Sequence, residues 1–150
     1  MTVFRTAPKK KRRAPKPRPA PLSLDGVTLP AGQRIVCDYP PIACSPNHRH
    51  RWEKIRATKG YRQACWALAL NARVQVPAEG PINVRLDFFP PSRVRRDDDN
   101  AEGAFKPGRD GIAQALKVDD SRFRIERVMR DEPLCCVVFT IIEGEESAHG

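Results

Sequence analysis

The sequence predicts a single α/β domain with two helices and a small mixed β-sheet, in the order β-α-β-α-β-β. Three observations support this prediction. The 150 residues suit one domain with a real core. Segments with strand and helix periodicity alternate along the chain, and two β-rich segments follow one another near its end. We expect the domain to span residues 22–143, between a disordered basic tail (1–21) and a polar tail (144–150).

Four segments have strand character. Residues 82–89 (INVRLDFF) give the strongest pattern, because apolar and polar side chains alternate along them. Residues 33–39 (QRIVCDY) are β-rich and end at two prolines. Residues 122–130 and 134–142 predict a final hairpin, and this hairpin is the reason for expecting a mixed sheet. The last segment is almost continuously apolar, which predicts a central or well-covered strand.

Residues 52–72 predict the first helix. One side can supply an apolar stripe for the core, and the other carries a basic flank. The expected stripe consists of Ile55, Cys65, Leu68 and Ala72, and the flank of Lys54, Arg56, Lys59 and Arg62.

Residues 100–116 predict the second helix. Asp99 suits its N-cap, with Glu102 three residues later as in a capping box. Pro107 removes a backbone donor and predicts a kink or an entry turn. The missing side chain at Gly103, four residues earlier, would ease that bend.

The net charge of +9 is concentrated in the N-terminal tail, since residues 1–18 hold eight Lys and Arg residues and no acid. The rest of the chain is close to neutral, at +1. Such a tail attracts polyanions without reading their sequence, or acts only as a solubilising segment. The five cysteines are an odd number and fit a reducing compartment. Without an apolar leader or spanning segment, the chain is expected in the cytoplasm, with no membrane partner.

An acidic cluster follows the strand at 82–89. Arg95 and Arg96 lead into three consecutive carboxylates, whose mutual repulsion a divalent cation relieves. Such a run can also be a solvated loop. In an extended segment Asp97 and Asp99 lie on one face, and Lys106 and Asp110 follow near multiples of the helical period. Asp119 and Asp120 precede the next strand, and we expect them to return to the same sheet edge as Asp97 and Asp99. Together these groups predict a metal-dependent phosphodiesterase centre.

Other interpretations of these polar residues are weaker. An EF-hand loop counted from Asp97 would place Ala101 and Gly108 at positions that need oxygen ligands, so calcium binding of that kind is excluded. Lys106 and Asp110 alone suit an ordinary i,i+4 ion pair. A zinc site would require an unusual ligand spacing; its candidate ligands are Cys37, Cys44, His48 and His50.

The run RRDDDNAEGAFKPGRDGIAQALKVDDSRF resembles the RusA-type Holliday-junction resolvases, especially their phage and prophage branch. The family signature is Arg-Asp-x-Asp-Asn, a lysine in the following helix, an Asp-Gly-hydrophobic step and then Asp-Asp-Ser. A second segment, PPIACSPNHRHRWEKIRATKGYR, is similar to the family's early Pro-Pro…Ser-Pro-Asn-x-Arg motif. The lysine lies farther from the asparagine than in the shorter resolvases. Together the two segments place the resemblance over residues 33–142.

The resemblance implies a homodimeric, Mg²⁺-dependent endonuclease of bacterial or phage origin, with Mn²⁺ as a substitute metal. It would cut four-way DNA junctions by paired symmetric nicks in recombination and repair. The metal-binding catalytic acids would be Asp97, Asp99 and Asp120, with Lys106 as the catalytic lysine. The implied DNA contacts are Asn47, Arg49, Lys59, Arg93, Arg95 and Arg96.

Two other functions fit the same sequence. One is a DNA-binding module that keeps the fold without cleaving. The other is a metal-dependent nuclease acting on other branched DNA or on RNA. A protein that only binds DNA gains nothing from carboxylates that face phosphate, so these residues favour a nuclease over the non-cleaving module.

Overall fold

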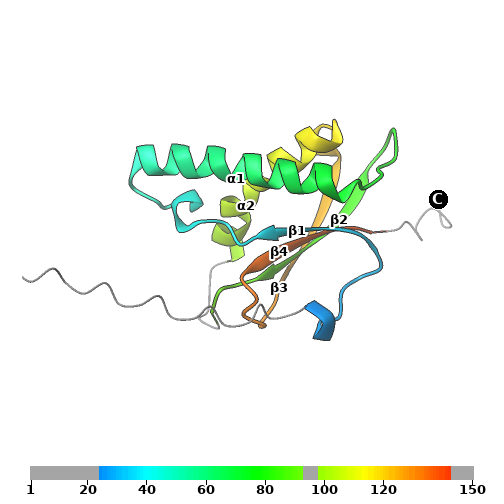
Figure 1. Cartoon of the computed structure of the whole chain (residues 1–150), viewed down its shortest axis with the longest axis horizontal. Helices are drawn as coiled ribbons and strands as arrows, with labels where there is room; N and C mark the ends of the chain where they lie inside the picture. Colours follow the sequence, from blue (N-terminus) through cyan, green and yellow to red (C-terminus); the bar gives the residue numbers. More distant parts are fainter. Residues whose placement is uncertain (1–23, 93–97, 143–150) are drawn as a thin grey trace, which may run out of the picture.

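The computed structural model describes residues 24–92 and 98–142; within the latter, the side chains of Asp98 and Asp99 lie outside the description. One mixed sheet of four strands forms the base of the domain, and both helices cover the same face of it (Figure 1). The elements follow the predicted order β-α-β-α-β-β. Their bounds are β1 Gly32–Asp38, α1 Arg51–Ala72, β2 Ile82–Phe89, α2 Asp98–Leu116, β3 Phe123–Met129 and β4 Cys136–Ile142, with single 3₁₀ turns at Leu24–Gly26, Ile42–Cys44 and Asp120–Arg122.

The strands lie side by side in the order β1-β4-β2-β3. β2 pairs parallel with β3, from Ile82 beside Phe123 to Phe88 beside Met129. β4 is antiparallel to both β1 and β2. The predicted hairpin between the last two strands is therefore wrong. Both edges of β4 are already paired, so β3 pairs with the far edge of β2, and this parallel pair makes the sheet mixed.

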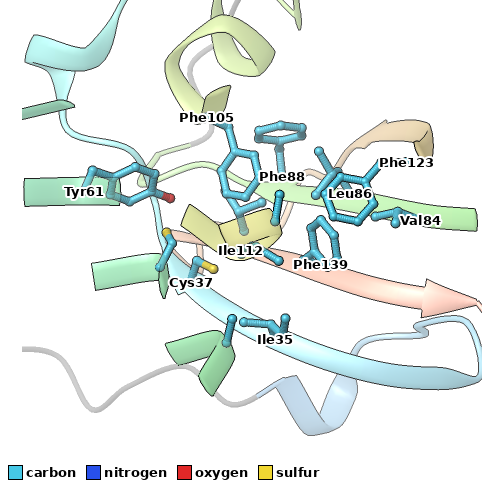
Figure 2. Close-up of a cluster of buried hydrophobic side chains, with 14 of the residues drawn as sticks. Ile35, Cys37, Tyr61, Val84, Leu86, Phe88, Phe105, Ile112, Phe123 and Phe139 are labelled. Carbon is cyan, nitrogen blue, oxygen red and sulfur yellow. The ribbon is translucent and has the colours of Figure 1, made fainter. Parts of the chain in front are cut away.

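The core lies between the helices and the sheet (Figure 2). In each strand every second residue points to the helices, as the alternation of apolar and polar side chains in β2 predicts. The aromatic rings of Phe88 and Phe105 meet edge to face with centroids 5.9 Å apart, and those of Phe123 and Phe139 at 5.4 Å. Fully buried side chains from β1, β2 and β4 complete this layer: Ile35, Ile82, Val84, Leu86 and Val137.

The buried face of α1 differs from the predicted stripe. Tyr61, Cys65 and Ala69 are buried, and of the four expected residues only Cys65 belongs to this set. The reason is the close approach of α2. A Cβ on Gly108 would meet the ring of Tyr61 and the sulfur of Cys65, and one on Gly111 would meet the backbone of α1. The contact therefore selects small or flat side chains at i, i+4 and i+8.

α2 begins at Asp98, earlier than predicted, so Asp99 lies within the helix and is not its N-cap. The Glu102 carboxylate accepts a hydrogen bond from Arg127 Nη1 at 2.6 Å and thereby joins α2 to β3. Pro107 lies inside the continuous helix. At Gly103 a Cβ would come within 2.7 Å of Pro46 Cγ, so this glycine also makes room for the loop before α1.

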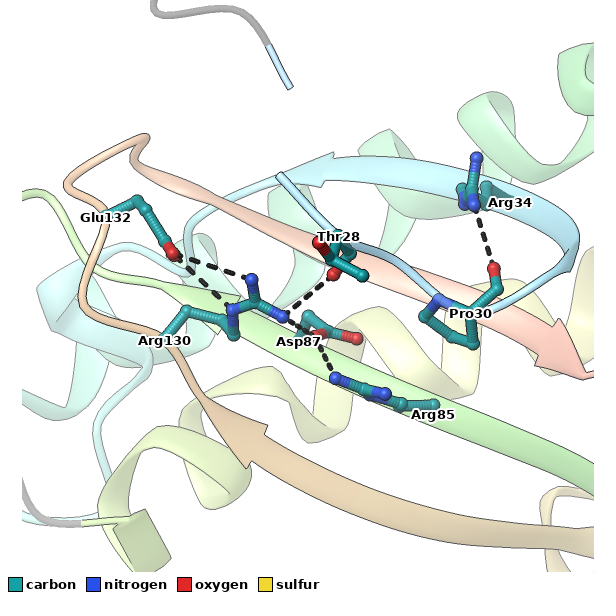
Figure 3. Close-up of polar contacts among 7 residues, drawn as sticks. All are labelled: Thr28, Pro30, Arg34, Arg85, Asp87, Arg130 and Glu132. Carbon is teal, nitrogen blue, oxygen red and sulfur yellow. Dashed lines mark hydrogen bonds and ion pairs between the residues drawn. The ribbon is translucent and has the colours of Figure 1, made fainter. Parts of the chain in front are cut away.

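The opposite face of the sheet holds a buried charge (Figure 3). Asp87 in β2 is fully buried, and its Oδ2 lies 3.1 Å from Arg85 Nη2 and 3.2 Å from Arg130 Nη1. Arg130 also donates to the backbone carbonyl of Thr28 at 3.0 Å and pairs with Glu132 at 3.3 Å. The segment before β1 is thus held across this face.

Candidate functional site

The acidic cluster lies at the start of α2. Arg93, Arg95, Arg96 and Asp97 fall outside the described residues, as does the side chain of Asp99. The backbone of Asp99 is helical, so Asp97 and Asp99 do not share the single extended segment that was predicted to align them. The cluster enters α2 directly, with its first turn next to the loop between β1 and α1.

Lys106 lies on the exposed surface of α2. In the described part of the chain its ammonium makes no ion pair, and the Lys106–Asp110 pair considered from the sequence does not form. A compact, unpaired ammonium beside an acidic cluster is free to contact a phosphate.

Asp120 lies in the 3₁₀ turn just before β3, with its side chain 38% exposed. Arg109 Nη2 lies 3.8 Å from Asp120 Oδ2, a loose ion pair that leaves the carboxylate partly accessible. The adjacent Asp119 has a different role. Its carboxylate accepts the backbone N–H of Ser121 at 2.9 Å, and this hydrogen bond lowers the pKa of Asp119. Asp119 therefore caps the turn, while Asp120 is oriented for other contacts.

The two acidic elements lie at opposite ends of α2. Asp97 and Asp99 follow the end of β2, whereas Asp120 precedes Phe123, which pairs with Ile82 at the beginning of β2. The prediction that both would return to one sheet edge is wrong for a single chain, because a parallel partner strand starts where its neighbour starts. Asp120 pairs with Arg109, ten residues after Asp99 in α2. Ten residues of helix rise about 15 Å, which is still more than one metal centre bridges.

The loop before α1 lies against the first turns of α2. Asn47 Nδ2 lies 3.5 Å from Asn100 Oδ1, and Pro46 fills the space beside Gly103. The neighbouring Arg49 is exposed. The segment carrying Asn47 and Arg49 is thus brought beside the acidic cluster across a long stretch of sequence.

Lys59 is exposed on α1, away from this junction. Arg56 and Arg62 of the predicted basic flank are exposed on the same helix, whereas Lys54 is half-buried and donates to the carbonyl of Pro46 at 3.4 Å.

A hollow of about 480 Å³ adjoins the start of α2, and no motif in the sequence predicts it. Its lining is mainly apolar and comes from the end of β1, the loop after it, the end of β2 and α2. The prolines that end β1 and β2 were visible in the sequence as strand terminators, but only the fold brings them together. The lining includes Tyr39, Pro40, Ile42, Pro91, Asn100 and Ala104.

The candidate zinc ligands are occupied by other contacts. The hydrogen bond of Cys37 with Cys65 and its burial raise the pKa of the Cys37 thiol. His48 Nε2 lies 3.0 Å from Glu53 Oε2. Within residues 24–92 and 100–142, no group of three or more His, Cys, Asp or Glu side chains is arranged to hold a metal.

No helix in the described part of the chain is long and apolar enough to cross a membrane.

In the comparison with known proteins, no family model matches the chain. A protein of Xylella fastidiosa (strain Temecula1), described as an uncharacterized protein, is 36% identical to the chain over 104 residues. The matched region covers 67% of this chain and 68% of the relative. The chain belongs to the family of this Xylella protein. The relationship to the Xylella protein carries no stated activity, so the function has to be argued from the residues themselves.

Proposed function

We propose that the chain is a RusA-type endodeoxyribonuclease that uses Mg²⁺ to nick four-way DNA junctions in bacterial or phage recombination and repair. One observation carries the proposal furthest. The two segments that resemble the resolvases are far apart in sequence, yet they meet at Asn47 and Asn100 and at Pro46 and Gly103. Contact between the two motifs is expected if they are parts of a single site.

The residues of the cluster fit a hard divalent cation. Asp97, Asp99 and Asp120 supply carboxylate oxygens, the donors that Mg²⁺ prefers. Asp120 is accessible, and its cationic neighbour Arg109 is loosely paired. Magnesium held by these carboxylates would supply Lewis-acid stabilisation of the phosphate and activate a water molecule.

The positive residues would bind and orient the phosphodiester. Lys106 is exposed on α2, makes no ion pair with another described residue, and would place its charge on the scissile phosphate. Arg93, Arg95 and Arg96 precede the acids and would guide the same strand. Asn47 and Arg49, in the loop against α2, would contact the neighbouring backbone.

The separation of the acids supports a homodimer. Asp120 precedes β3 beside the start of β2, whereas the backbone of Asp99 follows the end of β2, so we expect the three acids to meet at one metal only across two chains. In a two-fold dimer, Asp97 and Asp99 of one protomer would meet Asp120 of its partner, giving two equal sites. A four-way junction has matching two-fold symmetry and needs two symmetric cuts.

The alternative functions are a non-cleaving DNA-binding module and a metal-dependent nuclease for other branched DNA or RNA. The partly exposed Asp120 and the exposed Lys106 favour catalysis over binding alone.

Purified protein should be incubated with a synthetic four-way junction and a matching linear duplex, with Mg²⁺ or with EDTA. The proposal predicts paired nicks in the junction only with Mg²⁺, and their loss in Asp120→Asn and Lys106→Gln. Glu126→Gln, which alters an exposed acid in the middle of β3, is the matched control. Binding without nicking would support the module, and equal cutting of the linear duplex would exclude junction specificity.

A further inference from the structure

The outer face of α1 carries large apolar side chains exposed to solvent. Trp52 is 73% exposed, Ile55 46%, Trp66 39% and Leu70 47%. Their spacing places them along one side of the helix, turned by roughly 115° around its axis from the buried Tyr61, Cys65 and Ala69. From Trp52 to Trp66 this side extends about 21 Å. An exposed apolar row of this length marks an interaction surface.

Cations lie along the same row. α1 contains five Lys and Arg residues and a single acid, Glu53, which lies beside His48. Arg56, Lys59 and Arg62 are exposed and have no acidic side chain as partner in the described part of the chain. The surface therefore has an indole ring near each end and, between them, positive charge without an acidic partner among the described residues.

A hollow of about 320 Å³ lies beside Trp66, between α1 and α2. Its lining combines an indole, a guanidinium and two side-chain amides, contributed by Arg62, Gln63, Trp66, Ala67 and Gln114. An indole offers a stacking surface, and amides offer both donors and acceptors to a planar polar edge. This combination suits a nucleobase better than an acyl chain, which has no polar edge.

The charge of the row distinguishes the candidate occupants. A second copy packed antiparallel on this face would place Lys59 and Arg62 opposite the same cations, with no acid on the row to neutralise them. A polyanion has the complementary charge, and aromatic residues interleaved with cations are the usual platform for unpaired nucleotides. We infer that the outer face of α1 binds a single-stranded nucleic-acid segment, with one base stacked on Trp66 in the hollow.

This surface includes none of the candidate carboxylates, so the inference goes beyond the proposed nuclease activity. Trp52 and Trp66 are the only two tryptophans in the sequence, and both lie on the row. Selective excitation of tryptophan therefore reports directly on its occupancy. Titration of the full chain with a short oligothymidine should quench this fluorescence, and a blunt duplex hairpin should quench it less.

Variants measured by anisotropy of a labelled oligothymidine test the contacts. Trp66→Ala and Trp52→Ala should each weaken binding roughly tenfold, within the range of one lost base stack. Lys59→Gln should reduce the slope of log affinity against log salt by about 0.7. Trp66→Phe keeps a stacking ring and should retain most of the affinity. Val36→Ala and Arg124→Gln alter exposed residues outside α1 and should bind like the unaltered chain.

Three results would overturn the inference. The first is unchanged affinity in both tryptophan variants. The second is dissociation of a dimer by Trp66→Ala in sedimentation, which would assign the face to a second copy. The third is quenching by anionic phosphatidylglycerol vesicles without quenching by oligothymidine. Asp120→Asn should bind oligothymidine normally, so a failure of the nuclease proposal can be told apart from a failure here.

Discussion

Gly111 of α2 lies directly against the main-chain carbonyl oxygen of Arg62 in α1, with no room for a side chain on the glycine. Gly111→Ala should therefore force the two helices apart. The cost of such overpacking, about 1–3 kcal/mol, exceeds the smaller gain in helix propensity. Urea denaturation should show a lower midpoint with an unchanged slope.

Gly60→Ala provides the matched control, because a Cβ on Gly60, in the middle of α1, meets nothing within 4 Å. That substitution should stabilise the domain by up to about 1 kcal/mol. Equal effects of the two substitutions would contradict the proposed role of Gly111 in helix packing.

Asp87 should be essential for stability although it lies far from the acidic cluster. Asp87→Asn keeps the shape but removes the negative charge that faces Arg85 and Arg130. Leaving two guanidinium groups without their buried counterion should cost about 3 kcal/mol. Denaturation measures this loss, with the exposed Asp131→Asn as control. An unchanged midpoint would contradict this stabilising role of the Asp87 charge.

Mixing two inactive variants tests whether each site is shared between protomers. If Asp99 and Asp120 act in one chain, a mixture of Asp99→Asn and Asp120→Asn proteins stays inactive, because every site contains one substitution. If they act across a dimer, each mixed dimer contains one intact site and one doubly altered site. Junction nicking should therefore return in the mixture, with single nicks replacing paired cuts. Separate tags on the two variants allow the mixed dimers to be isolated.

The cysteines should differ sharply in reactivity. Cys135 is exposed, whereas Cys37, Cys44 and Cys65 are buried. Burial and the charge of Cys135 raise the pKa of Cys136 to about 11, so at pH 8 this thiol is protonated and poorly nucleophilic. Ellman's reagent should modify one thiol rapidly in the native protein.

Cys135→Ser should remove that rapid phase. Raising the pH toward 11 should then increase the reactivity of Cys136, because its thiolate becomes populated. Rapid modification of three or more thiols at pH 8 would contradict the buried positions of the others.

The sequence was sufficient for the elements but not for their pairing. β2 could be predicted residue by residue, because one buried face enforces strict alternation. The hairpin prediction failed because nearness in sequence favours local pairing, whereas the apolar character of β4 reflects two flanking strands. The buried face of α1 was missed because its apolar residues surround the helix. Only the position of the α2 glycines selects Tyr61, Cys65 and Ala69.

The candidate site, too, could be predicted from the sequence only in part. Motif spacing predicts Lys106 and Asp120 as site residues, and the structure leaves both at least partly accessible. The separation of Asp120 from the backbone of Asp99 was not visible in the sequence, because it follows from the parallel β2–β3 pair. The hollow beside Trp66 depends on how α1 and α2 cross, which residue periodicity does not encode.

The strand order also determines when the sheet can be completed during synthesis. β1 is made first, but its only neighbour in the sheet is β4, which is made last. β2, α2 and β3 can assemble as a unit before then, whereas β1 must wait with an unpaired edge until the ribosome has released residues 136–142. Nascent chains stalled before that point should therefore expose β1 to chaperones and proteases. Loss of the final strand should remove β1 from the sheet as well.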